Sequence, residues 1–357
     1  MIKVKSPGKL FLAGEYAVVE DSQPAIVFST DKFVEITLDK AESHDFGTIE
    51  SYSGEKVKFF RDGKIYLERD DKKFEYVLLA LNTVEEYLRD DIKNFDLYDI
   101  KITSQLEENG ESLGLGSSGA VTVGLVKAVL KYYKQKYDSE DLFKISAIAS
   151  LRKSFNISCG DLAAIAYKGL IYYKKFKLEQ VKEFMAKKTL KETVNMHWSS
   201  LRIKKIRDPK QYNFLIGWSG KKASSIDLVG QFKKGAEGKE DLYQAFLEES
   251  KACVNDMFEG FLEGNEELIK ENIDKNREIL LKYSKEFGVE IETDTLKKGI
   301  EAVGEDGGSA KASGAGGGDC LIALLDEDID QKPILEKWED IPIKKLDIGV
   351  YEGVENV

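Results

Sequence analysis

Three glycine-rich stretches hold the residues best suited to chemistry in this sequence. They read PGKLFLAGEYAVV at residues 7–19, GLGSSGA at 114–120 and KASGAGGGDC at 311–320. Glycine lets backbone N–H groups approach an anion closely, and a Gly/Ser loop that opens a helix adds the positive end of the helix dipole. Several such loops in one chain favour a small ligand with several phosphate groups over a polymer.

The middle stretch also matches three other phosphate motifs, and each match fails on its context. Its glycines give GxGxxG, but the preceding EENGES is polar, whereas the dinucleotide-binding fold needs a buried strand there. Adding Val121 gives the protein-kinase loop, yet no HRD follows, and the DFG at 45–47 comes before the loop. A Walker A loop needs Lys followed by Ser or Thr where this chain has Ala120 and Val121.

What remains is a phosphate-binding helix start. Ser117 and Ser118 can cap the helix, and one of their hydroxyls can reach a magnesium ion. Ordinary helix capping without a ligand is the simpler alternative for this loop taken alone.

Composition excludes several classes of protein. A chain of 357 residues suggests two domains. The formal net charge of −11, from 53 Lys and Arg against 64 Asp and Glu, argues against nucleic acid as the main partner. Three scattered cysteines and two distant histidines supply neither a disulfide framework nor a zinc site. The sequence shows no export signal and no apolar run near the roughly 18 residues that span a bilayer. We therefore expect a cytoplasmic protein without a membrane partner.

The elements that must position these loops form an α+β pattern. Short strands broken by a glycine turn are expected in residues 1–40, polar hairpins in 44–75, and further strands at 97–106, 169–176, 212–218, 319–325 and 343–351. Helical periodicity predicts helices at 74–89, 120–136, 140–153, 158–167, 239–263, 265–286, 292–303 and 331–339. A polar loop is expected at 107–119.

In this order and spacing, the three stretches resemble the motifs of the GHMP kinase superfamily, which includes galactokinase, homoserine kinase, mevalonate kinase and phosphomevalonate kinase. The first resembles the family's lysine and GE-H/Y-A turn, the second its nucleotide phosphate loop, and the third its glycine-rich loop beside the acceptor. Mevalonate kinases usually have His where this chain has Tyr16, and they lack the acid supplied by Asp319. With SCGDLAA at 158–164, both features resemble the bacterial phosphomevalonate kinases. The chain departs from the family pattern at one point: the proline that usually lies a few residues before the second motif is missing, and residues 111–113 read ESL.

The resemblance implies an N-terminal domain at 1–176 of the ribosomal-S5-domain-2-like type, with a left-handed βαβ element, and a ferredoxin-like domain at 177–357. The resemblance places the active site in the cleft between these domains. The resemblance further implies ATP and Mg²⁺ as co-substrates and 5-phosphomevalonate as acceptor, giving 5-diphosphomevalonate and ADP in isoprenoid synthesis. A monomer or homodimer is expected.

The resemblance also assigns roles to single residues. Lys9 and Asp161 are the expected catalytic residues. The nucleotide phosphates are expected on Gly114, Leu115, Gly116, Ser117, Ser118 and Gly119, with Ser118 also on the metal ion. The acceptor is expected against Lys9, Tyr16, Ser158, Asp161, Ser224, Ser225, Lys311, Ser313, Gly314 and Ala315. Each has a simpler alternative, such as a solvated lysine, a helix-capping Asp161 or a Tyr16 in the strand core.

Charge adds two expectations. Two polyanions in an acidic protein require local cations, for which Lys9, Arg152, Lys153, Lys221 and Lys311 are the candidates. A phosphate monoester acceptor has a second pKa of about 6, so it needs no strong base. Asp161 is therefore expected to orient Lys9 or a metal ion. The alternatives left open are a mevalonate kinase or another small-alcohol kinase, an inactive ligand sensor and a diphosphomevalonate decarboxylase.

Overall fold

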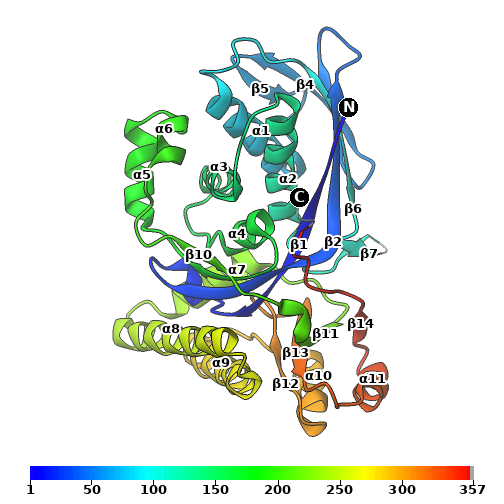
Figure 1. Cartoon of the computed structure of the whole chain (residues 1–357), viewed down its shortest axis with the longest axis vertical. Helices are drawn as coiled ribbons and strands as arrows, with labels where there is room; N and C mark the ends of the chain where they lie inside the picture. Colours follow the sequence, from blue (N-terminus) through cyan, green and yellow to red (C-terminus); the bar gives the residue numbers. More distant parts are fainter. Residues whose placement is uncertain (109, 354–357) are drawn as a thin grey trace.

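Two β-sheets of unequal size organise the chain (Figure 1). The structure, a computed structural model, describes residues 1–108 and 110–353, so Asn109 of the expected polar loop lies outside the described residues. The larger sheet contains, in spatial order, β10 (Arg202–Lys205), β9 (Leu170–Lys174), β2 (Pro24–Lys40), β6 (Tyr98–Ser104), β3 (Gly47–Glu50), β4 (Lys56–Asp62) and β5 (Lys64–Leu67), with β1 (Ile2–Ala13) paired to β2. The smaller contains β12 (Ser309–Ala312), β13 (Cys320–Leu325), β11 (Asn213–Trp218) and β14 (Lys344–Leu346).

The two longest strands, β1 and β2, are the central structural elements of the molecule. The sequence predicted shorter strands broken at a glycine turn, whereas each strand is continuous, and β1 shifts register between Pro7 and Lys9 and again between Phe11 and Ala13. The first irregularity contains Gly8, where an added Cβ would lie 2.7 Å from the Thr30 hydroxyl. A bulge bends a strand without ending it, and glycine permits the close approach that the bend needs.

Helices cover one face of the larger sheet (Figure 1). They are α1 (Glu75–Leu88), α2 (Ser117–Tyr132), α3 (Ser139–Leu151) and α4 (Gly160–Tyr167). The predicted helices at 74–89, 140–153 and 158–167 agree within about two residues, because their apolar spacing is strong. At α3 the Asp138 side chain accepts a hydrogen bond from the Asp141 N–H, and the Asp141 side chain accepts one from the Asp138 N–H, which is a capping box.

The first sheet extends beyond the domain boundary expected at residue 176. Strand β10 pairs with β9 in the register Arg202↔Lys174, and α5 (Leu178–Lys187) and α6 (Leu190–Asn195) lie between them in sequence. The buried Trp198 ring stands 4.7 Å from Phe176 and 6.3 Å from Phe143, which ties this segment to the first core. We therefore propose that the boundary lies between β10 and β11. The RIKK sequence of β10 has no apolar alternation, so periodicity could not reveal it.

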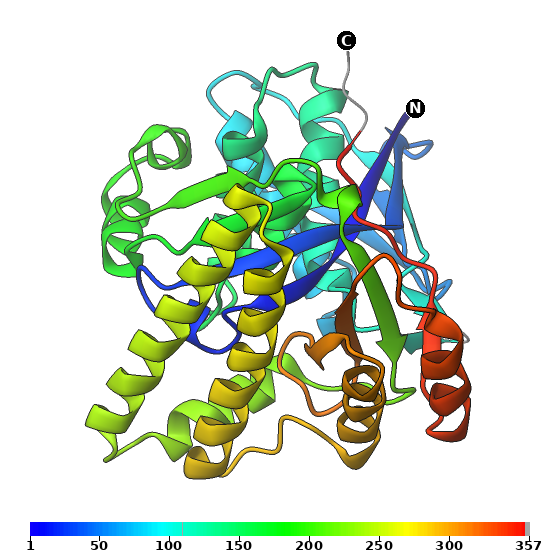
Figure 2. The ribbon, with the colours of Figure 1, turned by 60° about the horizontal axis from the view of Figure 1, so that its bottom comes forward.

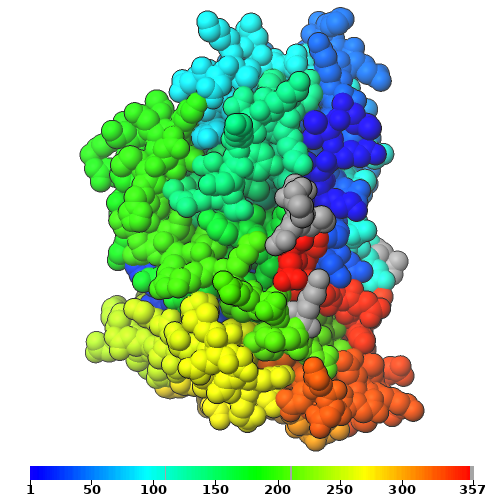
Figure 3. All heavy atoms as spheres, viewed as in Figure 1, coloured from blue at the N-terminus to red at the C-terminus, as the bar shows by residue number. Residues whose placement is uncertain are grey.

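The smaller sheet and its helices form a second layer, which packs beneath the layer of the larger sheet and its helices (Figure 3). Its helices are α7 (Ser225–Gly235), α8 (Glu240–Glu263), α9 (Glu266–Phe287), α10 (Asp294–Glu305) and α11 (Gln331–Asp340). Helices α8 and α9 run side by side as an antiparallel pair (Figure 2). The strand predicted at 343–351 is shorter, because after β14 the chain returns to the first sheet through a Thr30↔Val350 bridge.

The remaining elements are short. They are β7 (Glu107–Glu108), β8 (Glu111–Ser112) and the 3-10 turns η1 (Ala17–Val19), η2 (Lys72–Phe74) and η3 (Pro209–Gln211). The α+β class expected from the sequence is confirmed.

Side chains from the first and third glycine-rich stretches join the two layers. Lys311 Nζ lies 2.5 Å from the Glu15 carboxylate, and both side chains are almost completely buried, at 1% and 2% exposed. The Ser313 hydroxyl donates to the Phe11 carbonyl at 2.8 Å and accepts from the Phe11 N–H at 3.1 Å. Strand β1 is therefore fastened to the smaller sheet through side chains rather than through strand pairing.

This buried ion pair predicts a stability defect. Lys311→Met leaves the Glu15 carboxylate buried without its counter-charge, and we expect unfolding to become easier by about 3–5 kcal/mol. Urea unfolding measures the loss. Lys297→Met, which removes a 60% exposed ammonium 4.0 Å from Glu301, is the control and should change stability by less than about 0.5 kcal/mol. A loss below about 1 kcal/mol for Lys311→Met would contradict the role assigned to the pair.

Candidate active site

A cavity of about 610 Å³ opens between the two layers. Residues from all three glycine-rich stretches line it, together with the loops before α4 and α7. The members that the sequence singled out are Lys9, Gly114, Gly116, Tyr16, Ser117, Ser118, Gly119, Ser158, Asp161, Ser224, Ser225, Gly314 and Ala315. The prediction of a site in the cleft between two domains agrees with this placement.

Lys9 lies at the junction of the three stretches. Its backbone N–H donates to the Leu115 carbonyl at 2.8 Å, and its ammonium donates to the Gly114 carbonyl at 3.3 Å. The Lys9 stem crosses Gly116 so closely that an added Cβ there would lie 2.7 Å from Lys9 Cε. A glycine at residue 116 is therefore needed for the lysine to reach the cavity, and the φ of 80° at Gly116 favours glycine as well.

The second stretch forms an open helix start. Gly116 is the N-cap of α2 and contributes no side-chain hydrogen bond, so the capping by Ser117 or Ser118 considered from the sequence is not what the structure shows. Within the described part of the chain, the buried Ser117 Oγ has no hydrogen-bond partner. The unpaired N–H groups and the positive helix end therefore face the cavity, which is the arrangement that binds phosphate.

Asp161 faces this helix start from α4. A Cβ added at Gly119 would lie 2.7 Å from Asp161 Oδ2, so the carboxylate packs directly on the first turn of α2. Burial raises the pKa of the Asp161 carboxyl above its usual range. The Lys9 charge and two backbone N–H groups oppose this rise without cancelling it. Asp161 and Lys9 thus interact across the floor of the cavity.

The third stretch brings a second carboxylate to Lys9. The Asp319 side chain lies against Gly114, where an added Cβ would be 2.5 Å from Asp319 Cβ, and it accepts from the Ala223 N–H at 3.3 Å. Burial raises the pKa of Asp319, and the Ala223 N–H, Lys9 and Lys222 oppose that rise. Gly314 and Ala315 line the cavity, whereas Gly316 packs behind them, with its Cβ position 2.2 Å from the Ile291 carbonyl oxygen.

Tyr16 also lines the cavity and links three elements. Its hydroxyl donates to the Ala315 carbonyl at 2.5 Å, and its ring packs 4.5 Å from Phe232 of α7. Burial raises the pKa of the phenol, so it stays protonated. Two serines line the cavity as well: the Ser158 hydroxyl accepts from the Gly160 N–H at 3.2 Å, and Ser224 is the N-cap of α7.

Several predicted residues lie away from the cavity surface. Lys311 is committed to Glu15, Ser313 to Phe11, and the buried Leu115 contributes its carbonyl to Lys9. Of the other cation candidates, Lys153 lines the cavity, while Arg152 bonds Glu86 at 2.9 Å.

Sequence reasoning missed other lining residues. They include Glu15, Tyr52, Tyr76, Lys222 and Asp319. The sequence marked Asp319 only as a feature of the resemblance and not as a site residue, and only tertiary structure brings Tyr52 and Tyr76 to the same cavity. Lys222, rather than its neighbour Lys221, lines the cavity, and this choice depends on the loop geometry after β11.

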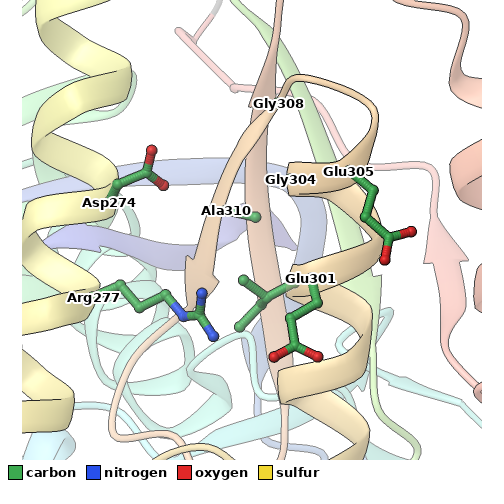
Figure 4. A pocket seen from close by; sticks show the side chains of 8 residues that line it. Asp274, Arg277, Glu301, Gly304, Glu305, Gly308 and Ala310 are labelled. Atoms are coloured by element: carbon green, nitrogen blue, oxygen red, sulfur yellow. The ribbon is translucent and has the colours of Figure 1, made fainter.

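A smaller cavity of about 370 Å³ lies on the second layer, away from these motifs. Figure 4 shows Asp274 and Arg277 on α9 and, across from them, Glu301 and Glu305 on α10. Arg277 pairs with Glu292 at 2.7 Å and Asp274 accepts from the Ser309 hydroxyl at 2.8 Å, so the bonds of both side chains are internal to the layer.

Known proteins resemble the chain in sequence and structure. The model of the GHMP kinases N terminal domain matches residues 75–169, and that of the GHMP kinases C terminal domain matches 257–343. A phosphomevalonate kinase of Streptomyces sp. (strain CL190) is 30% identical, with 98% of this chain and 97% of the relative covered. The chain belongs to the GHMP kinase family. The second and third glycine-rich stretches of this GHMP kinase lie within the residues that the two family models match, and the first stretch precedes them.

Solved structures agree with this family fold. Lin0012 from Listeria innocua gives a TM-score of 0.89 at 31% identity, over 98% of this chain and 99% of that one. Streptococcus pneumoniae phosphomevalonate kinase in complex with phosphomevalonate and AMPPNP gives 0.85 at 30% identity, over 98% and 100%. A mevalonate kinase from Methanocaldococcus jannaschii is 25% identical over 95% of this chain and 97% of the relative.

The contact between Gly119 and Asp161 gives a direct test of the site geometry. Gly119→Ala suits a helix but pushes the carboxylate away, so we expect the phosphotransfer kcat to fall about 10- to 100-fold. Stability should change by less than about 1 kcal/mol, because alanine favours the helix by a similar amount. Gly304→Ala in α10, whose added Cβ meets nothing within 4 Å, is the matched control. Unchanged kcat in Gly119→Ala would contradict the placement of Asp161.

Proposed function

We propose that this GHMP kinase transfers the γ-phosphate of ATP to (R)-5-phosphomevalonate, giving (R)-5-diphosphomevalonate and ADP in the mevalonate pathway of isoprenoid synthesis. The observation that carries the proposal is Lys9, whose ammonium lies between an open helix start and two carboxylates in one cavity. The likeness to phosphomevalonate kinases over the full chain supports this acceptor.

Phosphoryl transfer requires positioning and charge neutralisation more than covalent chemistry by the protein. The N–H groups at the start of α2 bind the nucleotide phosphates, with Gly114, Gly116 and Gly119 allowing close approach. Lys9 neutralises charge between the transferred group and the acceptor. The two anionic substrates repel one another, so a cation held between them lowers the energy of the in-line geometry.

The residues present fit a magnesium ion carried in with the nucleotide. Mg²⁺ commonly keeps several waters and uses substrate phosphates with one or two protein oxygens. The described residues contain no group of three His, Cys, Asp or Glu side chains that could hold a metal, so a complete protein cage is not offered there. Ser118 at the cavity surface and the unpartnered Ser117 Oγ supply oxygens at the start of α2. When bound, the ion neutralises phosphate charge.

Asp161 orients Lys9 in this proposal. The acceptor phosphate, with its second pKa of about 6, is largely dianionic at neutral pH and can attack without a strong base. An ionised Asp161 beside Lys9 keeps the ammonium directed toward the phosphates. Asp319 supports the same ammonium from the third stretch, so the lysine is held from two sides.

The acceptor end is formed by Tyr16, Ser158, Ser224, Ser225 and the Gly314–Ala315 backbone. Hydroxyls and N–H groups there can bind phosphate and carboxylate oxygens. We also propose that Tyr52 and Tyr76, which line the same cavity, offer ring faces to the nucleotide base; the Lys153 ammonium lies 3.9 Å from the Tyr76 ring centre. Lys311 is excluded from direct contact in this proposal because of its bond to Glu15.

Location and assembly remain part of the proposal. The described residues contain no helix that is both long and apolar enough to cross a bilayer. The three cysteines are free and buried, which suits a reducing cytoplasm. We propose a cytoplasmic monomer or homodimer.

Acceptor identity is tested by steady-state assay. Pure protein with ATP and Mg²⁺ should release ADP with (R)-5-phosphomevalonate at a kcat/KM at least about 100-fold above that with mevalonate, since the acceptor end is built for an additional anion. ADP release is followed in a coupled assay, and phosphorus NMR identifies the diphosphate. A preference for mevalonate would establish the alternative, a mevalonate kinase, and ADP release accompanied by CO₂ would indicate a decarboxylase.

A pH profile tests the role of Asp161. Because burial raises its pKa, the carboxylate is lost as pH falls through a value above the usual carboxyl range, and the wild-type rate should decline there. Asp161→Asn should lower kcat about 10- to 100-fold, with residual activity rising from pH 6 to 8 as the acceptor becomes dianionic. An undetectable rate with a flat profile from pH 6 to 9 would instead indicate that Asp161 is an essential base.

A further inference from the structure

A further lysine, Lys175, lies buried behind the acceptor end of the cavity. Lys175 follows β9, and its side chain is completely buried. Its ammonium donates to the Val19 carbonyl at 2.5 Å and to the Ile157 carbonyl at 2.8 Å. Neither the sequence motifs nor the proposed phosphotransfer uses this residue.

The Lys175 charge has no close carboxylate partner among residues 1–108 and 110–353, where no carboxylate oxygen is within 4.0 Å of its ammonium. Asp21 and Glu20 act on it only through longer-range attraction. Asp21 accepts from the Leu178 N–H at 3.0 Å, and Glu20 pairs with Lys233 at 2.6 Å. A buried ammonium without an ion pair is costly, and an apolar side chain could fill the same space without that cost.

The two carbonyl groups belong to two different segments that line the cavity. Val19 ends η1, just after Tyr16, and Ile157 immediately precedes Ser158; both Val19 and Ile157 line the cavity. Tyr173, two residues before Lys175 on β9, donates its hydroxyl to the Ser158 carbonyl at 2.7 Å. Side chains from β9 and from the residue that follows it therefore bond the carbonyls of Ser158 and Ile157, and Lys175 joins this loop to the first motif.

We propose that Lys175 is a positioning residue that joins the Val19 and Ile157 walls of the acceptor end and favours an anionic acceptor there. The proposal rests on the proposed function, since it concerns the binding of that acceptor. Two effects act together. The ammonium turns two carbonyl oxygens away from the cavity, where they would repel an anion, and it adds a positive charge behind the wall in surroundings of low dielectric constant.

The loop that Lys175 holds also carries the catalytic carboxylate. Cys159 adopts a φ of 60° at the N-cap of α4, and Asp161 follows in the first turn of that helix. A non-glycine residue in the left-handed region is retained only where its surroundings enforce it. The bonds from Lys175 and Tyr173 to the two preceding carbonyls supply that constraint.

Two variants separate the effect of the Lys175 charge from that of its hydrogen bonds to the Val19 and Ile157 carbonyls, which we call the clamp. Lys175→Met keeps an unbranched side chain, one atom shorter, without charge or donors, and Lys175→Gln keeps N–H donors without charge. Lys174→Met is the matched control, because Lys174 is the adjacent residue on β9 and is only partly buried. Acceptor KM, ATP KM, kcat and backbone amide hydrogen exchange in residues 157–161 are measured for all four proteins.

We expect Lys175→Met to raise the acceptor KM about tenfold or more, with ATP KM changed less than about twofold, and to speed exchange in residues 157–161. Lys175→Gln should restore slow exchange but keep the raised acceptor KM. Lys174→Met should match the wild type in both. A lysine that merely fills space would lower thermal stability in Lys175→Met while leaving acceptor KM and exchange unchanged, and that result would overturn the proposal.

Failure of this inference differs from failure of the proposed function. If the wild-type protein does not use (R)-5-phosphomevalonate, the proposed function fails, whereas the exchange measurement needs no acceptor and still tests the clamp. If Lys175→Met does not fold, Lys175→Gln carries the comparison, and an acceptor KM equal to that of the wild type in that variant contradicts the contribution of charge.

Discussion

The close passage of Lys9 across Gly116 is the constraint on which the rest of the site depends. Only a residue without a Cβ lets the lysine stem reach the cavity at this point, because an added Cβ would lie 2.7 Å from Lys9 Cε. The same backbone turn leaves the N–H groups of α2 free for phosphate. One glycine thus places an ammonium and an anion-binding helix start side by side, in a chain whose formal net charge is −11.

Buried polar contacts keep this arrangement in register between the two layers. The Glu15–Lys311 pair, the Ser313 bonds to Phe11 and the Tyr16 bond to Ala315 all link the first motif to the third. The first motif, the third motif and the loop before α4 each contain a non-glycine residue with positive φ, namely Tyr16, Asp319 and Cys159. Backbone conformations of this kind cost energy, and the surrounding bonds explain how they persist.

The protein uses lysines in two ways near the cavity. Lys9 and Lys222 lie at its surface, where they can meet a ligand, whereas Lys175 and Lys311 lie behind its walls and bond to backbone carbonyls. Surface cations contribute directly to binding polyanions. Of the buried two, Lys311 is neutralised by Glu15, whereas we propose that Lys175 fixes the walls and extends its charge farther than a solvated lysine does. Family membership supplies the phosphotransfer chemistry, while these side chains are the ones we propose to shape what the chain accepts.

The sequence by itself determined the family motifs, the α+β class and most of the long helices, since glycine patterns and apolar spacing are local properties. Lys9, Asp161 and the loop from Gly114 to Gly119 could be named from their motifs alone. The sequence did not reveal β10 or the extent of the first sheet, because RIKK becomes a strand only by pairing with β9. Nor could it show that Lys311 turns inward to Glu15 while Lys222 lines the cavity. The direction of a lysine side chain depends on partners that are distant in sequence, and only the tertiary structure brings those partners together.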